Sequence, residues 1–182
     1  MEIEVKARLE NMALVKEKLN ALGCMFSQPK TQDDMVWVER NGSLDEFFLN
    51  NVFLRIRIQD GKKIILTAKK SKEKTGDGSL VKREHEVVVD SADEARGILE
   101  MLGLKEAVRV IKTRQTTHYK DFEICIDDID GLGVFIELEK IGSEEDAEKI
   151  QKEMIEFLAM LEIPASNRVL KGYDILMLEK QL

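Results

Sequence analysis

The sequence predicts an α+β fold: an antiparallel sheet of about seven or eight strands that curls or closes, with helices packed on its outside. Three observations support this. Segments of alternating apolar and polar residues recur along the chain, stretches of helical periodicity separate them, and Asp60-Gly61 and Asp130-Gly131 mark tight turns. With 182 residues, 43% of them hydrophobic, the chain can build one sizeable core, so we expect a single domain over residues 1–182.

Strands are predicted where apolar and polar residues alternate. In the first one, Ile3, Val5 and Ala7 share one face, while charged residues occupy the other. The predicted strands are residues 2–9, 34–39, 53–59, 63–70, 81–90, 108–116, 119–127 and 133–141. The polar segments 41–51 and 71–79 are expected to be surface loops.

Helices are predicted where apolar residues recur at helical spacing behind a capping residue. Asn11 caps the first helix, which ends at Gly23. Ser91 and Glu94 have the spacing of a capping box, and this second helix ends at Gly103. Ser143 begins the longest helix, which Pro164 ends, and a short helix is expected within residues 167–182.

The composition excludes several classes of protein. There are 35 acidic residues against 28 Lys and Arg, a formal charge of −7, which disfavours non-specific binding to nucleic acid. No apolar run approaches the roughly 18 residues of a membrane span, and the start of the chain lacks a signal-peptide pattern. We therefore expect a cytoplasmic protein that binds neither nucleic acid nor membrane.

The charged faces of the strands carry acids and bases together. They contain eight acids and seven bases: Glu2, Glu4, Lys6, Arg8, Arg55, Arg57, Lys69, Glu84, Glu86, Lys112, Arg114, Glu123, Asp127, Glu137 and Glu139. For a single strand, exposure to water explains such a face. Taken together, however, the helices need the aliphatic faces as their packing surface, which leaves the charged faces to line the inside of the curled sheet.

The residue types on these faces suit a complex of metal and triphosphate. Arg and Lys bind phosphate oxygens, Arg as a fork and Lys as a point charge. Glu residues two apart on one strand face place hard oxygen donors side by side, and Mg²⁺ or Mn²⁺ binds such donors together with phosphates. Such pairs occur at Glu2/Glu4, Glu84/Glu86 and Glu137/Glu139.

The two cysteines and two histidines do not form a zinc motif. Cys24 and Cys125 are far apart in the chain, and His85 and His118 have no metal-binding spacing to them. Both cysteines are expected to be reduced and buried.

Several motifs in order resemble the CYTH superfamily, which joins class IV adenylyl cyclases, thiamine triphosphatases and related inorganic triphosphatases. Glu2-Ile-Glu4-Val-Lys6 matches its ExExK signature. It is followed by Gln32-x-Asp34, Leu54-Arg55-Ile-Arg57, Leu66-Thr67-x-Lys69, Arg83-Glu84-x-Glu86, Lys112-x-Arg114, a segment from Asp127 through Leu132-Gly133 to Glu137-x-Glu139, and Tyr173-Asp174. The resemblance covers essentially the whole chain and is greatest to the class IV cyclase-like branch, although that branch usually has Tyr-Phe where this chain has Val36-Trp37.

The resemblance implies an eight-stranded, closed or nearly closed barrel, a triphosphate tunnel with helices packed outside. It also implies roles for individual residues. The divalent-metal ligands, or the residues supporting them, would be Glu2, Glu4, Asp127, Glu137 and Glu139. The substrate-binding residues would be Lys6, Arg55, Arg57, Lys69, Lys112 and Arg114. The catalytic set would be Glu4, Lys6, Lys112 and Glu137.

Three functions are compatible with these motifs. The favoured one is an adenylyl cyclase that converts ATP to cyclic AMP and pyrophosphate with Mg²⁺ or Mn²⁺. The second is a triphosphatase acting on inorganic or organic triphosphate such as thiamine triphosphate. The third is a non-catalytic nucleotide or polyphosphate binder, which would not need so many carboxylates. The expected partner is a nucleoside triphosphate or another small triphosphate, and a homodimer is a possible assembly.

Overall fold

The computed structural model describes residues 2–39, 52–74, 80–143 and 145–181. It contains nine strands and four helices in these ranges, in the order β1(Glu2–Arg8), α1(Met12–Ala21), β2(Lys30–Glu39), β3(Val52–Gln59), β4(Lys63–Lys74), β5(Leu80–Val89), α3(Ala92–Met101), β6(Leu104–Tyr119), β7(Phe122–Ile129), β8(Gly133–Ile141), α4(Ala147–Met160), β9(Arg168–Val169) and α5(Tyr173–Gln181). The strands form one antiparallel sheet in the order β5-β4-β3-β2-β6-β7-β8-β1-β9. The predicted α+β class with an antiparallel sheet is therefore confirmed.

The sheet differs from the prediction in its details. A ninth strand, β9, pairs with β1, where Lys6 lies opposite Val169. The predicted strand at 34–39 begins at Lys30, and the one at 108–116 extends from Leu104 to Tyr119. The turn from β6 into β7 contains Lys120, whose φ is 52°. The sheet thus has nine strands where eight were predicted, and the predicted loop at 41–51 lies outside the described residues.

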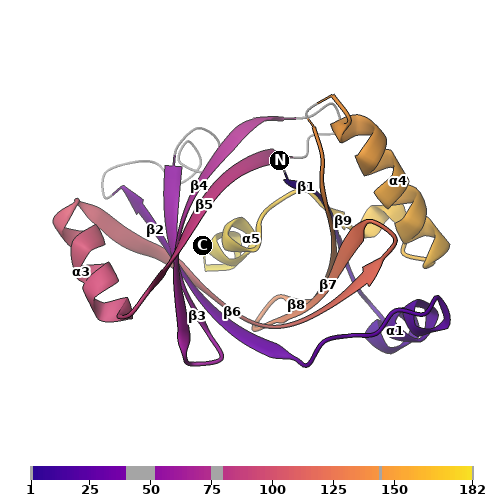
Figure 1. Ribbon diagram of the computed structural model, residues 1–182, viewed down its shortest axis with the longest axis horizontal. Helices are drawn as coiled ribbons and strands as arrows, with labels where there is room; N and C mark the ends of the chain where they lie inside the picture. Colours follow the sequence, from indigo (N-terminus) through magenta and orange to yellow (C-terminus); the bar gives the residue numbers. More distant parts are fainter. Residues whose placement is uncertain (1, 40–51, 75–79, 144, 182) are drawn as a thin grey trace. The chain divides into compact units, whose positions relative to one another are not determined.

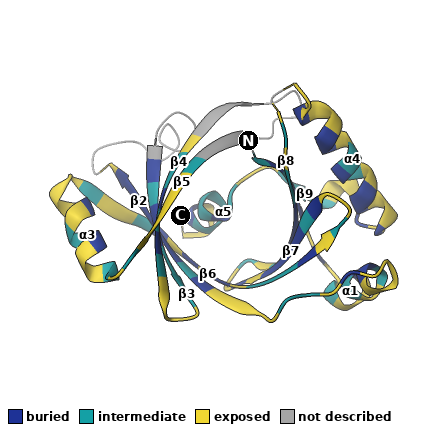
Figure 2. Ribbon diagram, in the orientation of Figure 1, coloured by how far each residue is buried: buried dark blue, intermediate teal, exposed yellow. Residues whose placement is uncertain are grey.

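The chain folds as two compact units. The first comprises Met1–Pro29, Lys74–Val81 and Thr113–Leu170, and the second comprises Lys30–Glu73, Lys82–Lys112 and Lys171–Leu182. In the first unit, α1 and α4 cover the apolar face of β1, β7 and β8 (Figure 1). Ile3, Val5, Leu138 and Met154 are buried there, and Figure 2 shows α4 with one buried and one exposed side. The other face of these strands is left to the charged residues, as the alternation predicts.

In the second unit, helices lie on both faces of the sheet. On one face, Ala95 and Leu99 of α3 pack with Met35, Trp37 and Ile56. On the opposite face, α5 packs over another buried apolar group, consisting of Val36, Val38, Phe53, Val108 and Leu178. Within the described residues, no helix is both long and apolar enough to cross a bilayer.

Candidate functional site

The first unit carries an acidic cluster, which we define as Glu2, Glu4, Lys6, Arg114, Glu123, Cys125, Asp127, Glu137 and Glu139. Strand register builds it as rows across β1, β8 and β7. Glu4 lies opposite Glu139, which lies opposite Glu123. The adjacent row contains Lys6, Glu137 and Cys125. The charged face predicted from alternation is thus a contiguous surface across three strands.

Lys6 is the cation of the second row. Its Nζ lies 2.8 Å from Glu137 Oε1 and 3.2 Å from Glu4 Oε1, and the side chain is buried. Burial by itself would lower the pKa of Lys6, but the carboxylates of Glu137 and Glu4 outweigh it and raise the pKa. The ammonium group therefore stays charged and joins two carboxylates.

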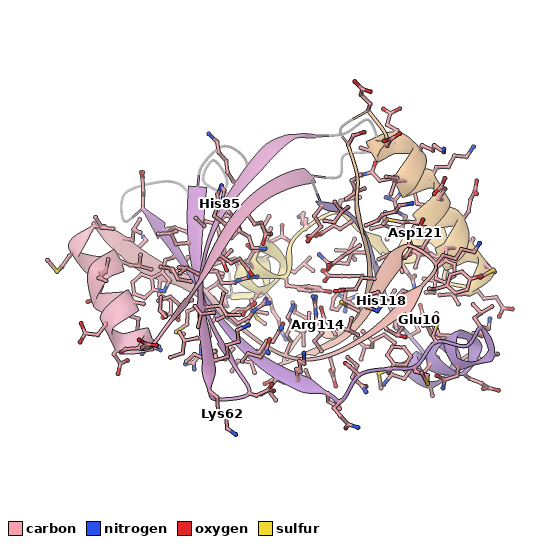
Figure 3. All side chains as sticks on the ribbon, viewed as in Figure 1. Glu10, Lys62, His85, Arg114, His118 and Asp121 are labelled. Atoms are coloured by element: carbon pink, nitrogen blue, oxygen red, sulfur yellow. The ribbon has the colours of Figure 1, made fainter. Side chains whose placement is uncertain are left out.

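Arg114 on β6 is the second cation of the acidic cluster (Figure 3). Its Nε and Nη2 donate to the two carboxylate oxygens of Asp127 at 2.7 and 2.6 Å, a bidentate pair. Nη2 also contacts Glu137, and Nη1 lies 3.6 Å from Glu139. Although burial opposes it, Glu137 and Asp127 hold the pKa of Arg114 well above its usual value. The structure thus places Arg114, predicted to bind phosphate, among three carboxylates.

Glu139 is the acid most affected by its surroundings. Burial, followed by repulsion from Glu137, Glu2 and Glu4, raises its pKa to about 8, although Arg114 acts in the opposite sense. Like charges on opposite positions of paired strands are destabilising, so this concentration of carboxylates has a cost that a divalent cation would relieve.

Cys125 is a member of this surface that the sequence did not predict. Its side chain is fully buried, and burial raises the thiol pKa well above its usual value. One ligand atom from each of Glu123, Cys125 and Glu139 lies within 4.8 Å of the other two. The carboxylates of Glu123 and Glu139 are therefore close enough to hold one divalent cation together.

The second unit carries a basic cluster, which we define as Asp34, Arg55, Arg57, Thr67, Lys69, Glu84, Glu86 and Lys112. Arg57 donates Nε and Nη2 to the two oxygens of Asp34 at 2.6 and 2.7 Å, directly across the β2–β3 pair. Burial alone would raise the pKa of Asp34, but Arg57 and Arg55 lower it to about 2. Asp34 is thus a permanent anion that positions the two guanidinium groups.

Arg55 is the most buried of these guanidinium groups. Nη2 donates to Thr67 Oγ1 at 3.1 Å and to Glu86 Oε1 at 3.0 Å, and Nη1 lies 3.9 Å from Asp34. Its Nε is buried without a hydrogen-bond partner. Burial and the neighbouring Arg57 lower the pKa of Arg55. An anion placed beside Arg55 would satisfy the free Nε and offset the repulsion between the two arginines.

Lys69 and Lys112 complete the basic cluster. Lys69 contacts the carboxylate of Glu84 across the β4–β5 pair. Lys112 is buried on β6, and its charge contributes to the lowered pKa of Asp34. Its Nζ lies 5.0 Å from the ring centroid of Tyr173, the first residue of α5. The predicted substrate-binding residues Arg55, Arg57 and Lys112 therefore share the neighbourhood of Asp34.

Residues 1–173 match the CYTH domain. The chain belongs to the CYTH family. It is 33% identical over 174 residues, 95% of this chain and 96% of the other, to a protein of Methanocaldococcus jannaschii named "Putative adenylate cyclase MJ0240". The recognition made from the motifs is thereby confirmed.

Solved structures share this CYTH fold. The PH1819 protein from Pyrococcus horikoshii OT3 aligns with a TM-score of 0.83 at 23% identity over 99% of both chains. A structure described as "Putative adenylyl cyclase HpAC1 from Hippeastrum", which "reveals a dominant" triphosphatase activity, aligns with a TM-score of 0.67 at 20% identity, covering 100% of this chain and 96% of the other. At these identities the likeness establishes the fold.

Proposed function

We propose that this CYTH protein cleaves a phosphoanhydride bond of a triphosphate with the help of Mg²⁺ or Mn²⁺. The observation that carries the proposal is the pairing of two chemistries in one chain: carboxylates concentrated around Glu139, and buried guanidinium groups around Arg55 with an unfilled donor. A polyphosphate binder without catalysis would need only the second.

We further propose that the chain is a single CYTH domain whose sheet closes into a triphosphate tunnel. Membership of the CYTH family supports this, since the motifs of both clusters lie within its match to residues 1–173. Arg55, Arg57, Lys69 and Lys112 would bind the phosphate oxygens as forks and point charges. Lys6, held by Glu4 and Glu137, would face the developing negative charge.

The metal would be held by Glu2, Glu4, Glu137 and Glu139. When bound, it would neutralise phosphate charge and lower the pKa of the attacking hydroxyl group or water. Asp127 would support this set indirectly, because both of its oxygens accept from Arg114, which in turn contacts Glu137 and Glu139. Arg114 and Asp127 are thus positioning residues in this proposal.

Two reactions are compatible with this arrangement. In the cyclase reaction, the ribose 3′-oxygen of ATP attacks the α-phosphorus, and pyrophosphate leaves. The name of the Methanocaldococcus jannaschii relative supports it. In the triphosphatase reaction, water attacks the terminal phosphorus, the remaining diphosphate leaves, and orthophosphate is formed. The activity stated for the Hippeastrum protein supports that alternative.

Product analysis tests the proposal. The purified protein is incubated with Mg²⁺ or Mn²⁺ and, separately, with ATP, thiamine triphosphate and inorganic tripolyphosphate. Cyclic AMP with pyrophosphate identifies a cyclase, and orthophosphate identifies a triphosphatase. A mock purification from cells that lack the expressed protein is the control, because any activity found in it comes from a contaminant. Absence of turnover with all three compounds contradicts the proposal.

A further inference from the structure

The face of the second unit that carries the basic cluster is polar at one end and apolar at the other. Along β2, Asp34 and Val36 are two residues apart and share a face, and Val36 lies directly opposite Arg55 on β3. Cβ atoms of such cross-strand partners are about 5 Å apart. An apolar surface therefore begins next to the guanidinium group that is expected to bind phosphate.

Helix α5 covers this apolar surface. Leu178 belongs to one buried group with Val36, Val38, Phe53 and Val108, and Ile175 and Met177 pack against that group. Figure 1 shows α5 on the side of β2 and β3 opposite to α3. Tyr173, at the start of α5, lies over Lys112 of the basic cluster. The helix thus extends from the edge of the basic cluster over the adjoining apolar surface.

An organic group attached to a bound triphosphate needs space next to the phosphates. A nucleobase stacks on apolar or aromatic surface. The apolar surface beside Arg55 is the one that α5 covers. Inorganic tripolyphosphate consists of phosphates alone and needs no such space. From this packing we infer that α5 is a specificity element that selects inorganic tripolyphosphate over nucleoside triphosphates.

This inference rests on the proposed cleavage of triphosphates and adds a substrate class to it. It places Leu178 as a specificity-determining residue that contacts neither phosphate nor metal. Nucleotides would enter only by displacing α5, so the cost of separating Leu178 from its apolar partners would appear as a lower kcat/KM for ATP. Burial of one leucine corresponds to about a tenfold effect or more.

The test compares kcat/KM for tripolyphosphate and ATP in the wild type, Leu178→Asp and Leu176→Asp. Leu176 is a half-buried leucine of the same helix that does not belong to the apolar group under α5, which makes it the matched control. We expect the wild type to prefer tripolyphosphate by about tenfold or more. Leu178→Asp should raise the ratio of ATP to tripolyphosphate turnover by a similar factor, and Leu176→Asp should leave the ratio within about twofold.

Hydrogen exchange of wild-type α5 gives a second readout that needs no variant. Ca²⁺ replaces Mg²⁺ to slow turnover, and the probes are tripolyphosphate and ATP at saturation. We expect ATP, but not tripolyphosphate, to accelerate exchange of the α5 amides. Equal preference for both substrates, an unchanged ratio in folded Leu178→Asp, or ATP binding with α5 still protected would overturn the inference. Failure of the wild type to cleave either compound would instead refute the proposed function.

Discussion

Glu4 on β1 and Glu139 on β8 face each other directly across an antiparallel strand pair. Opposed carboxylates destabilise a sheet, yet here they adjoin a third one, because Glu123 lies opposite Glu139 on its other side. Lys6, in the neighbouring row, forms ion pairs with Glu4 and Glu137. Its positive charge offsets part of the repulsion. The remaining part is visible in the pKa of Glu139, which burial and its acidic neighbours raise to about 8.

Without metal, stability should fall as the pH rises from about 5 to 8. In this range Glu139 is deprotonated in the unfolded chain and protonated in the folded one, since its pKa rises from 4.5 to about 8 on folding. The unfolded state therefore binds fewer protons, and the free energy of unfolding decreases with pH. Glu139→Gln should remove this slope and stabilise the protein at pH 8 by about 2 kcal/mol or more. Urea unfolding in EDTA measures this, with exposed Glu156→Gln as the control.

The same carboxylates should be required for turnover. We expect activity to depend on Mg²⁺ or Mn²⁺, and Glu4→Gln and Glu139→Gln each to abolish it while the protein stays folded. Both variants should melt at a higher temperature than the metal-free wild type, because each removes one member of a repelling set. Turnover and thermal melting are measured on the same samples. Full activity in EDTA would contradict the metal requirement.

The sequence predicted the acidic cluster well because one rule sufficed. Alternation along β1, β7 and β8 separates Ile3 and Val5, which are buried in the core, from Glu4 and Lys6 on the other face. Cys125 was the exception. Its burial was predicted correctly, and alternation puts it on the same face of β7 as Glu123, but only the register of β7 with β8 places it opposite Glu137.

The alternation rule predicts less in the second unit, because α5 covers one end of a sheet face whose other end carries the basic cluster. Val108 shares its face of β6 with Lys112, and Phe53 shares its face of β3 with Arg55. The prediction counted only the charged members of these faces, Arg55, Arg57 and Lys112. Only the packing of α5, a contact between distant segments of the chain, shows that the apolar end of this face is covered.

Arg114→Ala should destabilise the fold more than it weakens substrate binding. Asp127 is fully buried, and the substitution removes the guanidinium group that binds both of its oxygens. Loss of one partner from a buried ion pair costs about 3–5 kcal/mol. Denaturant unfolding measures the loss, and adding Asp127→Asn to Arg114→Ala should recover part of it. A loss below about 1 kcal/mol would contradict the structural role.

Lys112→Ala should have the opposite profile. Lys112 is a cation of the basic cluster, and its removal should weaken binding of tripolyphosphate by about 1.5–3 kcal/mol, the range for hydrogen bonds to charged groups. Calorimetry with Ca²⁺ in place of Mg²⁺ measures the affinity. Lys105→Ala, an exposed lysine of the same strand, is the control and should bind normally. Equal affinity in all three proteins would remove Lys112 from the phosphate-binding set.

The thiol of Cys125 should resist alkylation in the native protein. Two properties protect it: the side chain is fully buried, and its raised pKa leaves almost no thiolate, the reactive form, near neutral pH. Burial is the main cause of the raised pKa. The guanidinium group of Arg114 favours the thiolate, whereas the carboxylates of Glu139 and Glu137 disfavour it. Cys24 is also buried, so Cys24→Ser isolates the signal of Cys125. Treatment with iodoacetamide at about pH 8 should label this variant at least about a hundredfold more slowly than the urea-unfolded chain, because labelling has to wait for the sheet to open. Rapid labelling of the folded variant would mean that the β7–β8 face opens readily, which would contradict the burial of Cys125 within the acidic cluster.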